Sequence, residues 1–534
     1  MVNNQENSPL SFSSQNKDNE NSSGDQILED TISDPEVIQE PINEQSNVNV
    51  PIHHNKILNE LINQFERIDY QTLAFPNTDD LDEQNRPRLT EKHYLVLSIE
   101  NIIKVAQKNH WGLCKNLNFI YVFNGAYWSC IDKDEFQNFL AEAALIMGVP
   151  NFTAKYFMFS EKLYKQFLSV SFLGASVTNQ DKVCINLKNG TFEFNANELR
   201  LRPFESADFI TYQLPFEYNP DADAPIFQRY LDRVLPDIQR QMVLAEYLGY
   251  VFIKNGSSYL KEEKTLILYG TGANGKSVFF EVVNALLGEE NVSSYSMQSI
   301  TNDNGYFRAK LANKLVNYAS EISGKLQTAI FKAMVSGEPV EARLPYGEPF
   351  LLRQYAKLIF NCNELPRDVE HTNAFFRRFL IIPFDVTIPE VEQDKQLHNK
   401  IINNELSGVF NWVLKGLNRL MTQNGFTHCN AVNQATDQYR IQSDTVQLFL
   451  ESEEYVVSSI NYVPIQILYS EYREFCQQEG FSPLNKNNFI SRIRGAGIII
   501  EKKNFGVVAF LTSSRSQENK MFFQVSLASP KSPM

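Results

Sequence analysis

Apolar residues along this chain fall into short continuous runs and longer stretches with helical spacing, a pattern typical of a mixed α/β protein. The most regular unit has a β-prone run at 265–269, a glycine-rich loop, and a stretch at 278–287 in which Val, Phe and Leu recur every three or four residues. Gly288 follows, where helices commonly end in glycine. This part of the sequence therefore predicts a buried strand, a loop and a helix in direct succession.

Three later apolar runs, at 314–321, 356–363 and 379–382, predict strands that accompany the first one. Residues 224–253, just before the glycine-rich loop, have a helical pattern instead. We expect this helical stretch to pack the N-terminal region onto the strands that follow.

The flanking regions contain their own signals. The Asn-Gly pairs at 124–125 and 189–190 lie between β-prone runs and predict hairpins, and a helix is expected at 98–106. Toward the C-terminus the pattern predicts two helices joined by a turn, followed by strands; these lie at 465–478, 480–484, 485–494, 502–503 and from Met521 onward. Asn485 is the expected N-cap of the second helix.

Composition and charge add information mainly about the N-terminus. Of the net charge of −14, residues 1–50 contribute −9, from ten acids and one lysine, so the remaining residues carry −14 + 9 = −5. This polar, acidic stretch is expected to be disordered because it has little apolar material to bury. We divide the chain into a disordered acidic tail, an α+β region, a region around the glycine-rich loop, and a C-terminal region, at 1–54, 55–225, 226–436 and 437–534.

Targeting and metal signals are few. The first residues have neither the basic nor the apolar region of a signal peptide, and no run approaches the length of a membrane span. The six cysteines form no C-x-x-C pair, which argues for reduced thiols and against zinc. We therefore expect a cytoplasmic protein without a membrane partner.

The glycine-rich loop has the spacing G-x-x-x-x-G-K-[ST]. Its glycines would let backbone N–H groups surround phosphates, Lys276 would reach the β and γ oxygens, and Ser277 could bind Mg²⁺. The alternative is a dinucleotide loop, because the three glycines also satisfy G-x-G-x-x-G. The Gly-Lys-Ser ending favours a triphosphate such as ATP. The predicted contacts are Gly270, Thr271, Gly272, Ala273, Asn274, Gly275, Lys276, Ser277 and Val278.

Three polar residues that follow the later strands are candidates for catalysis. Glu321 ends the strand at 314–321, where an ATPase needs a carboxylate to orient water and hold Mg²⁺. Asn363 ends the next strand and could bind the γ-phosphate or the attacking water. Arg378, beside Arg377, could stabilise charge on a neighbouring subunit's nucleotide, although surface arginines are common and a structural role is the alternative.

The order GTGANGKS, LVNYASE, FNCNELP, FFRRFLIIPF resembles a superfamily 3 DNA helicase, of the type in phage and plasmid primase/helicases and related to the poxvirus primase-helicase. The resemblance covers roughly residues 115–520. It implies an α/β fold with a P-loop, AAA+-like superfamily 3 core, an α+β N-terminal domain and a C-terminal winged-helix domain. It also implies Walker roles for Lys276, Ser277 and Glu321, a sensor role for Asn363, and a finger role for Arg378. Many members have Asp where this chain has Ser320, which puts a second Mg²⁺ contact in doubt.

The resemblance also implies contacts with single-stranded and duplex DNA. The family has a hairpin in a central pore between the second and third motifs, where Lys332, Arg343, Tyr346 and Arg353 provide cations and an aromatic ring. The C-terminal winged helix would bind duplex DNA through Lys486, Arg492, Arg494, Lys502 and Lys503. A surface hairpin and a protein-docking domain are the respective alternatives.

The sequence therefore predicts an ATP-dependent DNA helicase for replication of a mobile element, acting as a ring, with a homo-hexamer implied by the family. Two alternatives stay open: a bifunctional primase-helicase, and an ATP-switched initiator that binds an origin without unwinding it. The acids at 79, 80 and 82 were considered as primase ligands, but a polar stretch without a strand favours a loop. A separate primase or another replication protein is then a possible partner.

Overall fold

The computed structural model describes residues 37–39, 53–76, 86–117, 119–171, 182–195, 198–320, 322, 326–345, 347–366 and 369–513. Glu321 and Tyr346 lie outside the described residues, as do the acids at 79, 80 and 82 and the strand expected from Met521. Within the stretch expected to be disordered, the structure has a short strand, β1 (Val37–Gln39), and the start of a helix at His54.

A helical region with a small sheet follows. Its helices are α1 (His54–Ile62), α2 (Tyr70–Ala74), α3 (Glu91–Lys108), α4 (Lys133–Ile146), α5 (Asn151–Ala154) and α6 (Phe157–Val170). The antiparallel strands β2 (Leu113–Asn116), β3 (Phe119–Phe123) and β4 (Trp128–Ile131) form its sheet. The hairpin predicted at Asn124 is confirmed, because the Asn124 Oδ1 accepts from the backbone N–H groups of Ala126 and Tyr127, at 3.1 and 2.8 Å.

A second sheet contains β5 (Val183–Leu187), β6 (Gly190–Asn195) and β7 (Glu198–Arg202), with β1 parallel to β7. The predicted Asn189-Gly190 hairpin is confirmed between β5 and β6. Gly190 has φ of 151°, and a side chain there would lie 2.7 Å from the Arg202 carbonyl oxygen. Glycine is therefore required at this turn.

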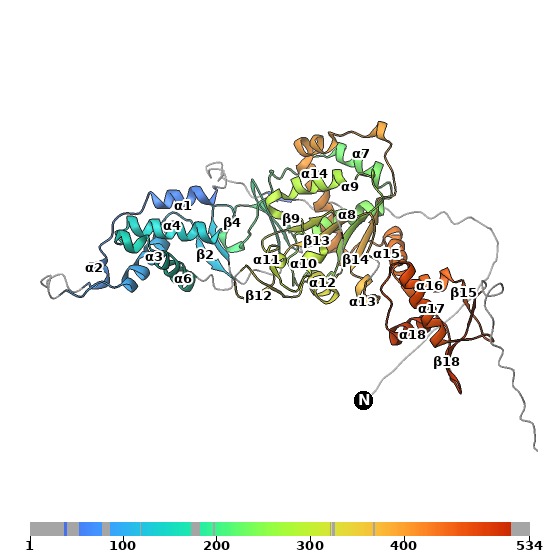
Figure 1. The fold of residues 1–534 in the computed structure, drawn as a ribbon. Helices are drawn as coiled ribbons and strands as arrows, with labels where there is room; N and C mark the ends of the chain where they lie inside the picture. The colour runs from blue at the N-terminus through green and yellow to red at the C-terminus, as the bar shows by residue number, and fades with distance from the viewer. Residues whose placement is uncertain are drawn as a thin grey trace, which may run out of the picture. The chain divides into compact units, whose positions relative to one another are not determined.

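The central sheet is entirely parallel. Its strands are β8 (Thr265–Tyr269), β9 (Val292–Ser293), β10 (Val316–Ala319), β13 (Lys357–Cys362) and β14 (Phe379–Pro383), in the order β14-β8-β13-β10-β9 (Figure 1). All four predicted strands are thus confirmed and share one sheet. Their carboxyl ends meet at one edge, where ligands bind in parallel sheets.

Burial on both faces of the sheet explains why three successive residues of β8, at 266–268, are apolar. Leu266 and Leu268 face one core with α8 (Ile238–Tyr250), α9 (Lys276–Leu287) and α14 (Leu397–Thr422). Ile267 faces the other, with α10 (Met297–Ile300), α12 (Thr328–Val335), α13 (Asn373–Phe376) and α15 (Asn430–Gln442). Helices on both faces remove the polar face that an exposed sheet would have.

Shorter elements complete the sheet region. They are η1 (Ser206–Asp208), α7 (Pro225–Val234), η2 (Glu289–Asn291), α11 (Tyr306–Ala309), β11 (Val340–Ala342), β12 (Phe350–Leu352) and η3 (Glu390–Glu392). Strands β11 and β12 pair as an antiparallel hairpin, in the place where the sequence predicted one.

The C-terminal region has its own core around Phe449, Tyr472 and Phe489. Its elements are α16 (Thr445–Ser452), β15 (Tyr455–Val457), β16 (Val463–Pro464), α17 (Ile465–Gln478), α18 (Lys486–Gly495), β17 (Ile500–Lys503), β18 (Gly506–Ala509) and β19 (Leu511–Ser513). Both predicted helices are confirmed, and Asn485 Oδ1 accepts from Asn488 N at 2.9 Å as the expected N-cap. No helix in the described part of the chain is long and apolar enough to span a membrane.

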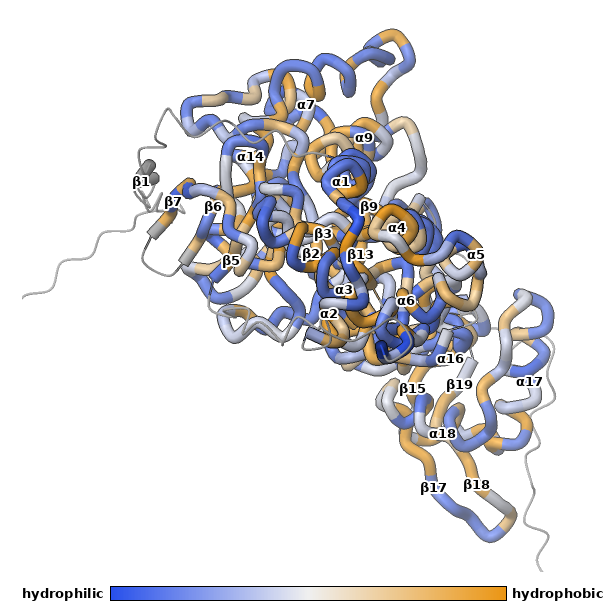
Figure 2. The backbone as a smooth tube through the Cα atoms, turned by 90° about the vertical axis from the view of Figure 1, so that its left-hand side faces the viewer, coloured by the Kyte–Doolittle hydropathy of each residue, from blue (hydrophilic) through white to orange (hydrophobic). Residues whose placement is uncertain are grey.

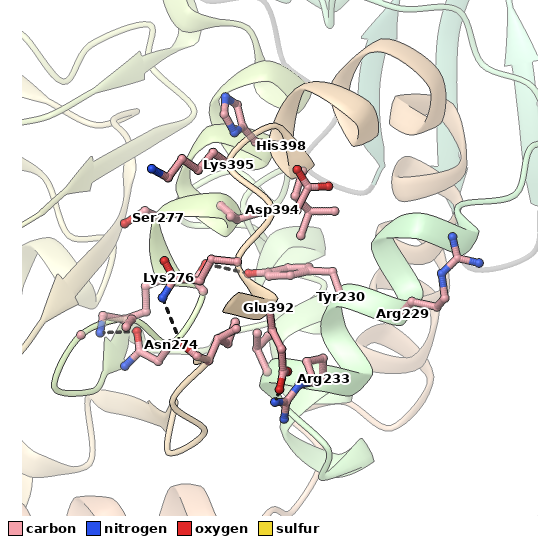
Figure 3. A pocket seen from close by; sticks show the side chains of 18 of the residues that line it. Arg229, Tyr230, Arg233, Asn274, Lys276, Ser277, Glu392, Asp394, Lys395 and His398 are labelled. Atoms are coloured by element: carbon pink, nitrogen blue, oxygen red, sulfur yellow. Dashed lines mark hydrogen bonds and ion pairs between the residues drawn. The ribbon is translucent and has the colours of Figure 1, made fainter. Parts of the chain in front are cut away.

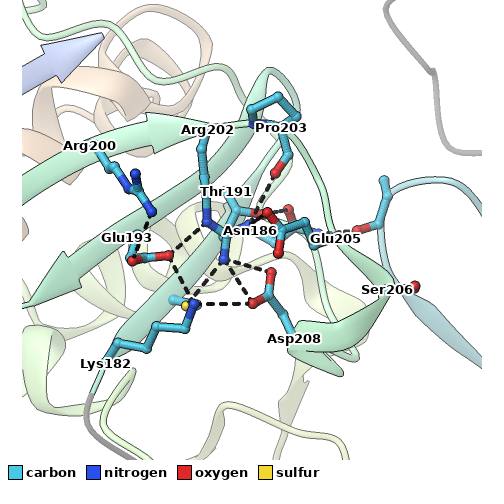
Figure 4. Close-up of polar contacts among 12 residues, drawn as sticks. Lys182, Asn186, Thr191, Glu193, Arg200, Arg202, Pro203, Glu205, Ser206 and Asp208 are labelled. Atoms are coloured by element: carbon cyan, nitrogen blue, oxygen red, sulfur yellow. Dashed lines mark hydrogen bonds and ion pairs between the residues drawn. The ribbon is translucent and has the colours of Figure 1, made fainter. Parts of the chain in front are cut away.

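A buried ion cluster joins β6 and β7 to η1 (Figure 4). Arg202 Nε donates to Glu193 Oε2 at 2.7 Å, and its Nη2 donates to both Asp208 oxygens at 2.8 Å. Lys182 adds an ion pair to Glu193 at 3.1 Å. Burial raises the pKa of the Glu193 carboxyl, but the hydrogen bonds from Arg202 and Lys182 outweigh burial and leave its pKa lowered.

Replacing Arg202 by Met should therefore destabilise this sheet by about 3–5 kcal/mol, because Glu193 and Asp208 would stay buried without their main partner. Hydrogen exchange at the β6 and β7 amides measures the loss. Because the pKa of the Glu193 carboxyl is lowered in the folded state, its ion pairs stabilise the fold at pH values above the ordinary carboxyl pKa, and this stabilisation is lost as the pH falls. The difference in stability between the unmutated chain and Arg202→Met should therefore become smaller in acid. Lys162→Met, which removes an exposed pair with Glu91, should change stability by less than about 1 kcal/mol; an equal loss in both variants would contradict the prediction.

Candidate functional site

The loop after β8 has the backbone geometry that the glycine spacing predicted. Gly272, Ala273 and Gly275 have φ values of 118°, 48° and 88°, so the chain turns repeatedly in the left-handed region. Among the described residues, no backbone carbonyl accepts from the N–H groups of these three. Successive N–H groups in such a turn form a concave site for anions. Helix α9 begins immediately at Lys276 and adds the positive end of its dipole.

The side chains of Asn274 and Lys276 hold the loop closed. Asn274 is buried and donates from Nδ2 to the Phe384 carbonyl at 3.1 Å. Lys276 Nζ donates to the Gly270 carbonyl at 2.7 Å and to Asn274 Oδ1 at 3.0 Å. Burial lowers the pKa of the Lys276 ammonium. A cation with few protein acceptors at the bottom of an anion-binding loop is suited to phosphate oxygens.

Helix α7 forms a second wall of this site. Tyr230 Oη donates to the Gly275 carbonyl at 2.9 Å, and a side chain at Gly275 would lie 2.7 Å from Val234. Figure 3 shows Tyr230 directed from α7 toward the loop, with Arg229 and Arg233 on the same helix. The helical pattern before the loop therefore positions a wall of the site as well as packing the core.

The segment between β14 and α14 closes the third side. Ile388 N donates to the Ala273 carbonyl at 2.8 Å, which fixes this segment to the loop. Together the loop, α7 and this segment enclose a cavity of about 850 Å³, within the range of nucleotide-sized ligand sites. Its lining includes Ser277, Ser320, Asn361, Asn363, Lys395 and His398.

The cavity is strongly cationic. Arg229, Arg233, Lys276, Lys395 and Lys400 line it, against the carboxylates Glu392 and Asp394. Arg233 pairs with Glu392 at 2.7 Å (Figure 3), and Lys400 pairs with Asp394 at 2.5 Å. The remaining positive charge favours a polyanionic ligand.

The predicted catalytic residues reach the site to different degrees. Asn363 and Ser277 are exposed to the cavity, at the carboxyl end of β13 and the start of α9. Ser320, the residue before Glu321, lines the cavity at the end of β10. Asn361 also lines it and accepts a hydrogen bond from the Tyr318 hydroxyl at 3.0 Å. Among the described residues, no group of three or more His, Cys, Asp and Glu side chains is placed to hold a metal ion.

Arg377 and Arg378 have different surroundings. Arg378 is buried; it donates to the Ala374 carbonyl and, at 2.8 Å, to the Ser336 hydroxyl. Arg377 has 57% of its side chain exposed and shares Glu263 with Arg378, at 2.9 and 3.1 Å. Neither residue lines the cavity of its own chain. Of the two guanidinium groups, that of Arg377 is exposed to solvent and that of Arg378, the residue preferred from the sequence, is held inside the fold.

The predicted hairpin cations do not share one environment. Lys332 is on α12 instead of the hairpin, and its ammonium pairs with Glu370 at 3.0 Å. Arg343 is exposed at the turn between β11 and β12, where Nε donates to the Gly347 carbonyl at 2.9 Å. Arg353 is exposed just after β12. The hairpin therefore presents two arginines to solvent, while Lys332 is held by an acid.

The predicted C-terminal bases also differ from one another. Lys486, Arg494 and Lys502 are exposed. Arg492 instead hydrogen-bonds the Nδ1 of His371, whose Nε2 faces the Arg440 carbonyl. Burial lowers the pKa of His371, so the ring is neutral and can accept from Arg492 at one nitrogen while donating at the other. Arg492 is consequently turned toward His371 and Asp444.

Sequence reasoning missed the cations of α7 and of the 388–400 segment. A signal for the first pair exists, because Arg229 and Arg233 are four residues apart and lie on the helix face opposite the buried Phe227, Leu231 and Val234. Nothing in the local pattern around Lys395 or Lys400 indicates a site; their role follows from the contact between Ile388 and the loop.

Three protein families match separate parts of the chain. Residues 106–236 match the family described as D5 N terminal like, and residues 441–519 match the one described as Poxvirus D5 protein-like. Between them, residues 268–378 match a family of unknown function, DUF5906.

Two relatives of this chain are viral proteins. The putative helicase L207/L206 of Acanthamoeba polyphaga mimivirus is 26% identical over 329 residues, which cover 56% of this chain and 33% of the viral protein. The putative helicase 121R of Invertebrate iridescent virus 3 is 21% identical over 368 residues, 60% and 38% of the two chains. The chain thus spans about a third to two-fifths of the length of these relatives.

A solved structure of the C-terminal region of NrS-1 is 14% identical, with a TM-score of 0.43, covering 77% of this chain and 98% of that one. The family matches and the viral relatives agree with one another in what they indicate about the chain. It contains D5 N terminal-like and poxvirus D5 protein-like segments and is homologous to viral proteins described as putative helicases.

Proposed function

We propose that this chain is an ATP-dependent DNA helicase of the superfamily 3 type, which translocates on single-stranded DNA as a ring, with a homo-hexamer as the expected assembly. The observation that carries the proposal is the cationic cavity over the loop 270–275, whose lining combines Lys276, Ser277 and Asn363. The homology to viral putative helicases supports a role in replication.

The residues of the cavity fit ATP and Mg²⁺. The N–H groups of the loop and the α9 N-terminus would hold the β-phosphate, while Lys276 would exchange its carbonyl partner for phosphate oxygens. Ser277, with Glu321, would hold Mg²⁺, which when bound neutralises charge on the phosphates. Asn363 would position the attacking water, and Glu321 would accept its proton. Arg229, Lys395 and the rest of the cationic wall would bind the remaining phosphate charge.

The sheet order supports these roles. Strand β13 lies between β8 and β10, so Asn363 is placed between the phosphate loop and the strand that leads to Glu321. An attacking water held over the loop would therefore lie near the Asn363 amide. The position of Asn363 is set by the order of the strands within one chain, so it does not depend on how subunits assemble.

We assign the DNA contacts to the predicted basic residues whose side chains are exposed to solvent. The β11–β12 hairpin would contact a single strand in the pore through Arg343 and Arg353. The C-terminal helix–turn–helix with a strand pair has the element order of a winged helix, and its exposed Lys486 and Arg494 would bind duplex phosphates.

Two other functions remain as alternatives. A primase-helicase would need a polymerase-like domain, and the viral relatives are long enough to hold further domains beyond the matched part. An ATP-switched initiator would use the same cavity and the same C-terminal region without moving along DNA. Strand displacement separates this initiator from a helicase.

Lys276→Ala should lower ATPase kcat by about 10²-fold or more, because the phosphates would lose the cation aimed at them. A steady-state ATPase assay with and without single-stranded DNA measures the loss. Lys188→Ala, an exposed lysine outside the cavity, is the matched control and should retain wild-type activity. Wild-type hydrolysis by Lys276→Ala would refute the assignment of the loop.

Arg377→Ala should abolish most ATPase activity, because the neighbouring nucleotide would lose its arginine finger. Stability should change little, since the Arg377 side chain is exposed and pairs with Glu263. Arg378→Ala should instead destabilise the fold by about 1–3 kcal/mol, because Ser336 and the Ala374 carbonyl would lose a buried donor. Mixed rings of Arg377→Ala and Lys276→Ala subunits should recover part of the activity, since some interfaces pair an intact loop with an intact finger. Normal ATPase in assembled Arg377→Ala rings would contradict the finger role.

A double variant, Arg343→Ala with Arg353→Ala, should reduce stimulation of ATPase by single strands and abolish strand displacement, because the hairpin would lose its phosphate partners. Basal ATPase should persist. Lys486→Ala with Arg494→Ala is the comparison, and it should weaken duplex binding while sparing stimulation by single strands. Normal unwinding by the hairpin variant would favour the initiator.

A further inference from the structure

The three-stranded sheet β16-β18-β17 carries a row of aromatic rings that the proposed function does not use. The rings of Tyr462 and Phe505 are stacked with centroids 6.0 Å apart, and those of Tyr462 and Phe510 are 5.9 Å apart. Phe505 has 64% and Tyr462 has 41% of its surface exposed. The three rings therefore form a row that starts beside the sheet and ends at the solvent-exposed ring of Phe505.

The hairpin places Phe505 at its tip. Lys503 pairs with Gly506 across the β17–β18 ladder, so the turn contains only Asn504 and Phe505. Gly506 has φ of 139°, a conformation that side chains rarely adopt, which makes the turn depend on glycine. In Figure 2 the β17–β18 hairpin extends beyond α17 and α18. Its end is thus accessible to a ligand from several directions.

The aromatic row does not belong to the core of the C-terminal region. That core is built from Phe449, Tyr472, Phe489 and their neighbours, and it includes Ala509 of β18. Tyr462, Phe505 and Phe510 are absent from it. Burial in the core therefore does not explain why three rings follow one another on this face.

A cation accompanies the rings. Lys503 Nζ lies 5.1 Å from the Tyr462 ring centre and 5.2 Å from that of Phe510, whereas the exposed Lys502 precedes it in β17 and points to the opposite face of the sheet. Glu501 is the only acid between residues 500 and 509. Exposed rings next to ammonium groups are what proteins use to bind single strands, with bases on the rings and phosphates on the cations.

We propose that this face is a single-strand binding site, in which bases stack on Phe505 and Tyr462 while Lys503 holds a phosphate. Paired bases in a duplex are already stacked and cannot reach the rings, so the site would take an unpaired strand. This differs from the duplex contact expected for Lys503. An apolar protein surface would cover the rings equally well, but it would leave the Lys503 ammonium without an anion. The inference rests on the proposed function in that a helicase supplies the unpaired strand.

A tryptophan at the tip reports on the site directly. Phe505→Trp in the full chain, without nucleotide, should show saturable fluorescence quenching when oligothymidine of about 20 nucleotides binds, because a base would stack on the indole. Phe152→Trp is the matched control, since Phe152 is 91% exposed on the N-terminal helical region. It should show no quenching beyond that of the unmutated chain. Unchanged fluorescence of the Phe505→Trp variant at saturating oligonucleotide would overturn the proposal, as would equal quenching in both variants.

Affinity provides the second measurement. Phe505→Ala should weaken oligothymidine binding by about 5- to 100-fold, the range for losing one stacked base, while a blunt duplex binds as before. Equal weakening for both ligands would assign the hairpin to duplex DNA and overturn the proposal. ATPase activity, still dependent on Lys276, should persist in every variant. If the unmutated chain hydrolysed no ATP, that result would contradict the proposed function. Fluorescence quenching in the Phe505→Trp variant tests the aromatic site alone.

Discussion

The candidate site depends on one constraint: β8 is hydrogen-bonded on both edges and buried on both faces. The chain leaves β8 at the carboxyl end of the strand, and it must turn sharply there to begin α9. The turn satisfies its own polar groups through Asn274 and Lys276, whose side chains bind carbonyls of the loop and of Phe384. The same turn leaves the N–H groups of Gly272, Ala273 and Gly275 without a backbone acceptor among the described residues, as in turns that bind anions.

Distant segments then complete the cavity by contacting this loop. Tyr230 attaches α7, and the Ile388 N–H attaches the segment before α14, each through one hydrogen bond to a loop carbonyl. These contacts bring Arg229, Lys395 and their neighbours to the cavity. Because β13 separates β8 from β10, the end of β13 places Asn363 beside them. The cationic cavity is consequently a product of the sheet order and of two attachment points.

Cations outside the cavity differ mainly in whether an acid or a buried acceptor holds them. Lys332, Arg378 and Arg492 are tied to Glu370, Ser336 and His371, whereas Arg343, Arg353, Lys486 and Arg494 are exposed. A guanidinium that is already bonded must lose those bonds before it binds DNA or a nucleotide, which costs free energy. Exposure therefore separates residues able to act on a ligand from residues that stabilise the fold, and the aromatic tip at Phe505 belongs to the first group.

The sequence by itself determined the strand, loop and helix around Lys276, four of the five strands of the central sheet, the two Asn-Gly hairpins and the C-terminal helices. These features are encoded locally, in apolar spacing, glycines at left-handed positions and a capping residue. Only the tertiary structure decided that Arg229, Arg233 and Lys395 line the cavity, that Arg377 is exposed while Arg378 is buried, and that Lys332 is paired. Each depends on which distant segment lies beside a side chain, and residue spacing along the chain carries no record of those neighbours.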